Sequence, residues 1–448
     1  MIRLLHTSDW HLGRTLCGNK RDDEFDLFLG WLVNCLQLHK IDVLLIAGDI
    51  FDSPAPSVAA QQLYYDFLRQ LVGSACRHVV IIAGNHDSPA FLEAPRGVLK
   101  EIGVHVVGAA RSESESEVIA LRNTAGDIEL VVAAVPFLRD RDVRISTYGD
   151  SDADRDQALV QGVRDHYAAV TAECLKQLPM GVPLVAMGHL FAAGSSVSSG
   201  DGVRELYIGS LGQVPCSVFP QDFDYVALGH LHRMQQAATL PEVWYSGSPL
   251  PMGFGEAAAE KFLRVLEFHP KDEDTVDPAD GRDTAAKKFA MRSETIAVPR
   301  FRRLASLSGD LDSLIRAVER ELLRLQEESP PLGTWLEVIY QGNEIAPDLS
   351  ERLARIVGGS KLEILRIRAE RDAVSNWAAG RPLAELAAES DSDDDGGGER
   401  SALTDDEAIG QIFERCLEFN RVPEDQRVML RELHHDVVQN LGLQAGGR

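Results

Sequence analysis

Carboxylate, carboxamide and imidazole side chains recur in five short segments of this chain, and these are the side chains best suited to bind metals. The segments are Asp9-Trp10-His11, Gly48-Asp49-Ile50-Phe51-Asp52, Gly84-Asn85-His86-Asp87, Gly188-His189 and Gly229-His230-Leu231-His232. A mixture of oxygen and nitrogen donors suits manganese, iron or zinc better than magnesium. A glycine opens four of the segments, where it lets the backbone turn sharply and approach an ion or a phosphate closely.

Each segment alone is a weak indication of a functional site, and the five segments in this order are a stronger one. A lone Asp-x-His or Gly-His pattern often arises by chance, whereas Gly-Asp-x-x-Asp and Gly-Asn-His-Asp concentrate polar side chains directly after an apolar run. We interpret the five segments as one constellation. The other eight histidines lie outside the pattern and are interpreted as surface or packing residues; they are His6, His39, His78, His105, His166, His269, His434 and His435.

Short apolar runs precede each segment, and they predict the strands that position these side chains. The expected strands are residues 2–6, 43–47, 79–83, 104–107, 129–134, 184–187, 225–228 and 262–268. Several are continuous runs of Val, Ile, Leu and Ala, which is typical of strands buried on both faces with helices packed outside. Residues 58–71 have apolar residues at helical spacing. The pattern predicts an α/β sandwich, in which loops at the carboxyl ends of the strands converge.

The pattern changes after a charged stretch at residues 270–283, which contains prolines and a glycine and predicts an exposed loop. Beyond it we expect strands at residues 303–307, 334–340 and 362–367, alternating with helices at 310–325 and 348–357. This order predicts a small α/β domain. Residues 389–400 are of low complexity and predict a disordered linker. Thr404 and Glu407 form a capping box before two amphipathic helices.

The charge of the chain bears on its partners. The formal net charge is −24 over 448 residues, and residues 385–407 contain ten acids and one base. Such acidity argues against general nucleic-acid binding, which normally uses a basic surface. If DNA is the substrate, bound metals or a partner must supply much of the positive charge.

The remaining composition indicates a cytoplasmic protein with no membrane contact. No run approaches the roughly 20 apolar residues of a membrane span. The N-terminus lacks the charged-then-apolar pattern of a signal peptide. The six cysteines are scattered without CxxC spacing, so we expect reduced thiols and neither a zinc knuckle nor a disulfide framework.

The ordered segments resemble the calcineurin-like metallophosphoesterase superfamily. The motifs HTSDWHLG, AGDIFDSPAPS, AGNHDS, YIGSLGQVP, ALGHLHR and YSGSPLP are similar to those of the SbcD family, the nuclease subunits of bacterial SbcC–SbcD DNA-repair complexes. The resemblance spans the N-terminal domain, the small α/β domain and the C-terminal helices. The acidic linker looks like a local elaboration.

The resemblance implies two metal sites that share one ligand. The first ion would be held by Asp9, His11, Asp49 and His232, and the second by Asp49, Asn85, His189 and His230, with Asp49 bridging. His86 would not be a ligand; it would protonate the leaving oxygen or stabilise the transition state. Asp52 would orient His86.

The resemblance also implies domains with different functions along the chain. Residues 1–275 would form the nuclease domain and residues 285–375 a small α/β cap that recognises DNA. Residues 385–402 would form the disordered acidic linker, and residues 403–443 the helices that bind the coiled coil of SbcC.

The implied activity is manganese-dependent cleavage of DNA, with two metal ions. The chain would act as an exonuclease on double-stranded ends and as an endonuclease on single strands and hairpins. It would form a homodimer, with contacts near residues 58–71 and 90–101, inside a heterotetramer with two copies of the ATPase SbcC.

Two alternatives stay open. The first is another enzyme on the same scaffold, such as a phosphatase, a nucleotidase or a cyclic-nucleotide phosphodiesterase; the appended domain and helices disfavour it. The second is a non-catalytic scaffold, which the presence of every expected ligand disfavours.

Overall fold

The computed structural model of this chain describes residues 1–143, 152–192, 214–270, 289–342 and 348–369, together with Phe413, Glu414, Arg427, Leu430 and Arg431. The chain divides into two compact units, Met1–Ala369 and Glu370–Arg448. The predicted linker and most of the predicted C-terminal helices lie outside the described residues. Within the second unit, Arg431 forms a bidentate ion pair with Glu414, at 2.7 and 2.8 Å.

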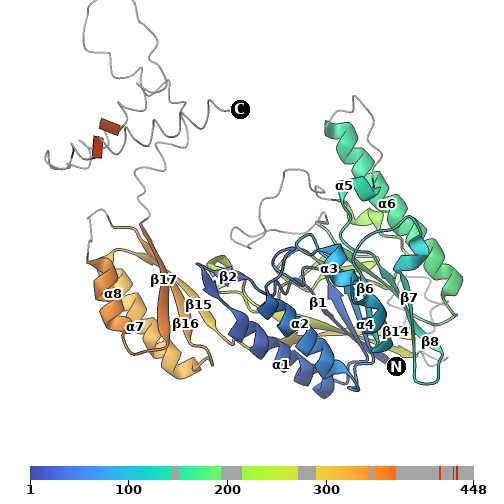
Figure 1. Cartoon of the computed structure of the whole chain (residues 1–448), viewed down its shortest axis with the longest axis horizontal. Helices are drawn as coiled ribbons and strands as arrows, with labels where there is room; N and C mark the ends of the chain where they lie inside the picture. The colour runs from blue at the N-terminus through green and yellow to red at the C-terminus, as the bar shows by residue number, and fades with distance from the viewer. Residues whose placement is uncertain are drawn as a thin grey trace, which may run out of the picture. The chain divides into compact units, whose positions relative to one another are not determined.

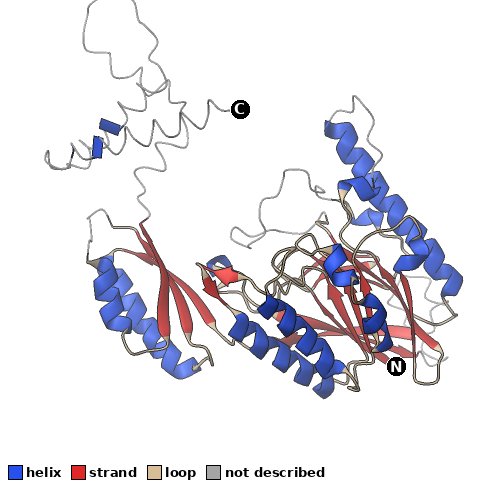
Figure 2. Cartoon of the chain, in the orientation of Figure 1, coloured by secondary structure: helices blue, strands red, loops and turns tan. Residues whose placement is uncertain are grey.

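Two six-stranded sheets form the larger part of the first unit (Figures 1 and 2). The first sheet has the order β14 (Phe289–Ala297), β13 (Phe262–Pro270), β1 (Ile2–Thr7), β4 (Val43–Ala47), β5 (His78–Ile82) and β6 (Val104–Val107). The second has the order β11 (Gln235–Thr239), β12 (Glu242–Tyr245), β10 (Tyr225–Gly229), β9 (Leu184–His189), β8 (Ile128–Ala134) and β7 (Val118–Arg122). A two-stranded ribbon joins β2 (Thr15–Leu16) to β3 (Asn19–Lys20).

Each six-stranded sheet contains four parallel strands, with antiparallel strands added at one edge of the first sheet and at both edges of the second. Strands β1, β4, β5 and β6 run parallel, as do β8, β9, β10 and β12. Strands β13 and β14 are added antiparallel at one edge of the first sheet, and β7 and β11 close the two edges of the second. The predicted sandwich is confirmed, and all eight predicted strands are present. Residues 289–297 belong to its first sheet, although the sequence placed the start of the second domain at residue 285.

Helices cover the outer faces of both sheets (Figure 1). Those packed on the first sheet are α1 (Asp22–Leu38), α2 (Val58–Leu71), α3 (Pro89–Glu93) and α4 (Arg96–Glu101). The second sheet carries α6 (Asp152–Gln177), and the shorter elements are α5 (Asp140–Val143), η1 (Ser114–Glu117), η2 (Cys216–Val218) and η3 (Phe254–Glu256). The predicted helix over residues 58–71 is confirmed, and the Oγ of Ser57 caps it by accepting from the Ala60 amide at 3.2 Å.

Burial on both faces explains why the central strands are continuously apolar. In β4, Val43 and Leu45 face the second sheet, whereas Leu44 and Ile46 pack under the helices. Side chains alternate between the two faces of a strand, so a strand between two cores needs apolar residues at every position.

A three-stranded parallel sheet with two helices follows the sandwich in the chain. It contains β15 (Arg303–Gly309), α7 (Leu311–Glu328), β16 (Thr334–Tyr340), α8 (Leu349–Val357) and β17 (Leu362–Ala369), which confirms the predicted alternation. Leu314, Leu336 and Leu353 are among the residues of its separate core. Asp310 begins α7 by accepting from the Ser313 amide at 2.8 Å.

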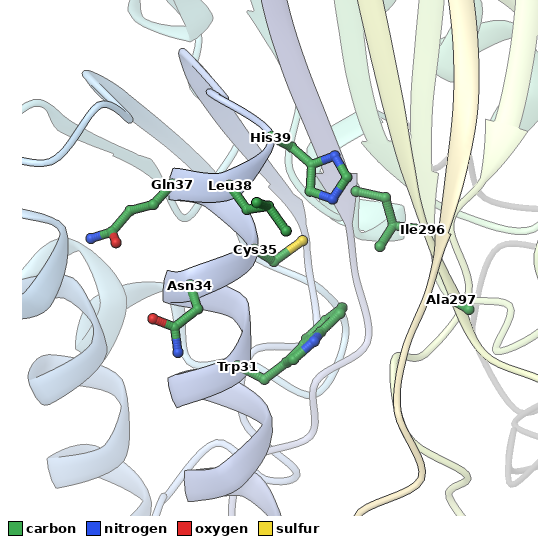
Figure 3. A pocket seen from close by; sticks show the side chains of 8 residues that line it. All are labelled: Trp31, Asn34, Cys35, Gln37, Leu38, His39, Ile296 and Ala297. Atoms are coloured by element: carbon green, nitrogen blue, oxygen red, sulfur yellow. The ribbon is translucent and has the colours of Figure 1, made fainter.

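A groove of about 750 Å³ lies between α1 and β14 (Figure 3). Trp31, Cys35 and Leu38 line it from α1, and Ile296 and Ala297 line it from β14. None of its lining residues belongs to the five motif segments. Among the described residues, every helix is too short or too polar to cross a membrane.

The buried imidazole of His6 predicts a measurable loss of stability in acid. His6 lies within 3.0 Å of the Tyr225 hydroxyl, and burial together with the Arg264 charge lowers its pKa to about 3. The unfolded chain therefore binds a proton below pH 6.5 that the folded chain does not bind until about pH 3. Stability consequently falls as the pH drops through this window.

We expect wild type to lose about 2 kcal/mol more of its free energy of unfolding than His6→Gln when the pH falls from 7 to 5. Urea unfolding of both proteins at both pH values measures this difference. Equal losses in the two proteins would show that His6 does not contribute.

Candidate metal centre

Five loops at one end of the sandwich carry the nine candidate residues. Asp9 and His11 follow β1, Asp49 and Asp52 follow β4, and Asn85 and His86 follow β5; His189 ends β9, and His230 and His232 follow β10. Three of these strands belong to the first sheet and two to the second. Because each group of strands is parallel, their carboxyl ends bring residues far apart in the sequence to one place.

The first group of donor atoms comes from Asp9, His11, His232 and Asp49. The Nε2 atoms of His11 and His232 lie 3.2 Å apart, and His11 Nε2 lies 3.6 Å from Asp49 Oδ2. Atoms of Asp9, His11 and His232 lie within 4.8 Å of one another. Two ligands at roughly 2.1 Å from one ion lie roughly 3.0–3.6 Å apart, so these donors fit a shared divalent ion.

The second group comes from Asn85, His189, His230 and again Asp49. His189 Nε2 lies 3.0 Å from Asn85 Oδ1 and 3.5 Å from Asp49 Oδ2. His230 Nδ1 lies 3.1 Å from the same Asn85 oxygen. These separations also fit one ion. The Asp49 Oδ2 atom therefore lies between two groups of donors, where it could bridge two ions.

The charges at the centre are strongly coupled. Burial would raise the pKa of Asp49, but the His189 and His11 rings hold it far below its usual range. Burial would lower the pKa of His189, but Asp49 raises it to about 9. Burial and the neighbouring His189 lower the pKa of His230 to about 4. At neutral pH the carboxylate is therefore ionised and His230 is neutral, which are the states that can bind a metal, whereas His189 would have to release a proton to bind one.

Two of the imidazoles are oriented by partners on their second nitrogen. His189 Nδ1 lies 2.9 Å from the carbonyl oxygen of Ala47, and His232 Nδ1 lies 3.1 Å from Glu256 Oε1. A carbonyl or an ionised carboxylate can only accept, so each Nδ1 carries the hydrogen. In the neutral ring, each Nε2 is then the nitrogen that can bind an ion.

His86 and Asp52 contact each other through the main chain. His86 Nδ1 lies 2.8 Å from the Asp52 carbonyl oxygen, while the Asp52 carboxylate lies 2.9 Å from Arg14 Nη1 and 3.4 Å from His11 Nδ1. The family resemblance implied that Asp52, as the second acid of its segment, orients His86. The structure shows the carboxylate turned toward Arg14 and His11, so the carbonyl oxygen is the group that holds the His86 ring.

Asp87 joins two of the loops. Its carboxylate accepts from the amides of Ile50 at 3.2 Å, Phe51 at 3.0 Å and Gly84 at 2.9 Å. Burial and the nearby Asp49 charge raise the pKa of Asp87 to about 6. The fourth residue of the Gly-Asn-His-Asp segment therefore fixes the loop after β4 against the loop after β5.

The backbone at the centre is held in unusual conformations. Asp9, His11, Asp49 and His230 have φ values of 53°, 49°, 50° and 99°. Residues other than glycine rarely adopt positive φ, and such strain persists only where the surrounding structure enforces it. Gly84 allows a close approach of two loops, because a Cβ there would lie 2.1 Å from Asp49 Oδ1.

Sequence reasoning missed several residues that support the ligands. Arg14 contacts Asp52, Ser8 donates to Asp9 at 2.5 Å, and Glu256 contacts His232. Ser8 belongs to the HTSDWHLG motif, whose Asp and His drew attention first. Glu256 follows His232 by 24 residues in no recognisable pattern, so the sequence held no signal for it.

Comparison with known proteins agrees with this geometry. The family model described as calcineurin-like phosphoesterase matches residues 2–234, and the SbcD_C model, described as type 5 capsule protein repressor C-terminal domain, matches residues 300–420.

Curated relatives are named as the SbcD component of the nuclease SbcCD. The Escherichia coli K12 protein is 30% identical over 441 residues, which cover 98% of each chain. The Rhodobacter capsulatus protein is 38% identical over 60% of this chain and 66% of its own, and the Bacillus subtilis protein is 34% identical over 61% and 68%. The chain therefore belongs to the calcineurin-like phosphoesterase family and, within it, to the SbcD nuclease subunits.

Proposed function

We propose that this chain is a metal-dependent nuclease that hydrolyses DNA phosphodiester bonds and acts with SbcC. One observation carries the proposal: Asp49 Oδ2 lies 3.6 Å from His11 Nε2 and 3.5 Å from His189 Nε2, between two sets of donors. Centres of two metal ions are a recurrent solution for phosphoester hydrolysis. The relatives' shared name, which describes a component of the nuclease SbcCD, supports DNA as the substrate and SbcC as the partner.

The proposed ligands follow the two groups of donors. Asp9, His11, Asp49 and His232 hold one ion, and Asp49, Asn85, His189 and His230 hold the other. Mixed oxygen and nitrogen donors suit manganese, iron or zinc better than magnesium, and we propose Mn²⁺ because the family resemblance implies it. Bound together, two divalent ions offset the negative charge that grows on a phosphodiester during hydrolysis.

His86 is proposed to act on the substrate and not on the ions. Its ring lies against that of His11, with centroids 4.8 Å apart, and its Nδ1 is held by the Asp52 carbonyl. With Nδ1 engaged in this way, Nε2 is the nitrogen that can meet the leaving oxygen. Imidazole can donate a proton near neutral pH, which suits this role.

The domain roles remain proposals as well. Residues 1–275 supply the nuclease centre, and residues 285–375 recognise DNA. Residues 385–402 form a disordered acidic linker to residues 403–443, which bind the SbcC coiled coil. With a net charge of −24, the chain needs the ions and SbcC to bring DNA close. We further propose two copies of each subunit, exonuclease action on double-stranded ends, endonuclease action on single strands and hairpins, and a cytoplasmic location.

A comparison of substrates tests the proposed activity. The metal-free protein is supplied with Mn²⁺ and assayed on duplex DNA, on a DNA hairpin and on a phosphomonoester. We expect cleavage of both DNA substrates and little release of phosphate from the monoester. Rapid hydrolysis of the monoester alone would favour a phosphatase, and no hydrolysis with two bound ions would favour a scaffold.

The role of His86 predicts a separation of catalysis from binding. Replacing a positioned proton donor typically costs roughly 100- to 10,000-fold in rate. We expect His86→Gln to lose cleavage by this factor while it binds Mn²⁺ and DNA as wild type does. Equilibrium dialysis and a DNA-binding assay on the same preparation measure the two properties.

Asp49→Asn provides the contrast, because it weakens a ligand of both proposed ions. We expect this variant to lose affinity for both ions together. Loss of both ions in His86→Gln would instead show that His86 is a ligand.

Exposed apolar side chains on two neighbouring helices support the proposed dimer. Val58 and Tyr65 of α2 are 69% and 36% exposed, and Val98 of α4 is 74% exposed. Apolar residues gathered on a surface often mark an interface. We expect Tyr65→Glu to yield monomers in light scattering, because a charge there would be buried without a partner. Leu175→Glu on α6, where the side chain is 46% exposed, is the control and should remain dimeric.

The C-terminal segment is proposed to bind the partner and not the substrate. A chain ending near residue 389 keeps the first compact unit, Met1–Ala369. We expect it to cleave a simple phosphodiester with metal but to lose stable binding to SbcC. Phe413→Glu with Leu417→Glu should act like the truncation. A pull-down with SbcC beside a nuclease assay measures both, and full partner binding by the truncated chain would contradict the assignment.

A further inference from the structure

Glu256 is a buried acid whose two carboxylate oxygens both have hydrogen-bond partners. It ends η3 and is 4% exposed. Oε1 lies 3.1 Å from His232 Nδ1, and Oε2 accepts from Lys261 Nζ at 2.5 Å and from the Met252 amide at 3.2 Å. A buried carboxylate with this many donors is held in one orientation.

Lys261 contacts the main chain of the same histidine, His232. Its Nζ donates to the His232 carbonyl oxygen at 3.1 Å and to Ser248 Oγ at 2.8 Å, as well as to Glu256. The ring of His232 is thus fixed by Glu256 and its main chain by Lys261. The two charges of the pair also offset each other, which lets both remain buried.

The geometry at His232 determines which nitrogen can bind an ion. An ionised carboxylate accepts only, so Nδ1 of His232 carries a hydrogen and, in the neutral ring, the lone pair lies on Nε2. That Nε2 lies 3.2 Å from His11 Nε2, inside the first group of donors. Partners of this kind orient metal-binding histidines and make them more basic ligands.

We propose that Glu256, itself held by Lys261, is a positioning residue that presents His232 Nε2 to the first metal ion. This inference rests on the proposed two-ion centre and adds to it a residue outside the five motif segments. Glu256 contacts neither the substrate nor the ion in this role. It acts on one of the two ions through His232. The second group of donors does not include His232, so it does not depend on Glu256.

A second buried pair of glutamate and histidine supplies a matched control. Glu117 Oε2 lies 2.8 Å from His166 Nε2, and the Glu117 side chain is fully buried. Neither residue is among the candidate ligands. Replacing Glu117 therefore disturbs a buried pair of the same chemistry without touching the centre, and it reports what a purely structural change does.

The test is a titration of metal-free full-length protein with Mn²⁺ by equilibrium dialysis, beside thermal unfolding without metal. We expect Glu256→Ala to lower the affinity for one Mn²⁺ ion by roughly 10- to 100-fold and to leave the affinity for the other unchanged. Glu256→Gln keeps the size and an accepting oxygen, so we expect a loss near the lower end of that range. It serves as the test if the alanine variant fails to fold. Glu117→Gln should melt at a lower temperature and bind both ions normally.

The outcomes separate this inference from the proposed function. If wild type binds no Mn²⁺, the two-ion centre is wrong and the inference falls with it. If wild type binds two ions and the Glu256 variants bind them equally well, only the positioning role is overturned. If the Glu256 and Glu117 variants lower the affinity for both ions to the same extent, Glu256 has only a structural role.

Discussion

The carboxylate of Asp49 is buried where the loops of two sheets meet, and its charge has to be offset there. The residue is 2% exposed, and the imidazoles of His11 and His189 and the main-chain amide of His86 surround its carboxylate. A buried charge without such partners would be strongly destabilising. Placing those partners requires β1, β4, β5, β9 and β10 to end at one level, which the parallel centres of the two sheets provide. The positive φ values of Asp9, His11 and Asp49 are a further cost of this arrangement.

The central strands and the candidate ligands were readable from the sequence because both arise from local patterns. A strand buried on both faces needs a continuous apolar run, and residues 43–47 and 184–187 have one. A polar cluster directly after such a run is conspicuous, so Asp49 and Asn85 can be identified from the sequence alone. The helix at residues 58–71 was equally clear from its apolar spacing, and the structure adds the cap at Ser57.

The edge strands and the supporting residues depend on tertiary contacts that no local pattern encodes. Strand β14 is mostly exposed and β11 reads Gln-Gln-Ala-Ala-Thr, so neither has the apolar run of a central strand. Glu256 acquires its meaning only when the chain brings it to His232. The contact between Asp52 and His86 shows the same limit: the pattern identified the pair, but only the fold shows that a carbonyl oxygen makes the contact.

The pairing of β1 with β13 bears on the order in which a nascent chain can fold. Ile2 lies opposite Phe268, so β1 has one edge open until nearly the whole sandwich has been synthesised. At about 5–20 residues per second, that interval is on the order of tens of seconds. β4 can pair with the other edge much earlier. During translation, β1 is therefore an apolar strand with one unpaired edge, which is the kind of edge at which another chain can add wrongly.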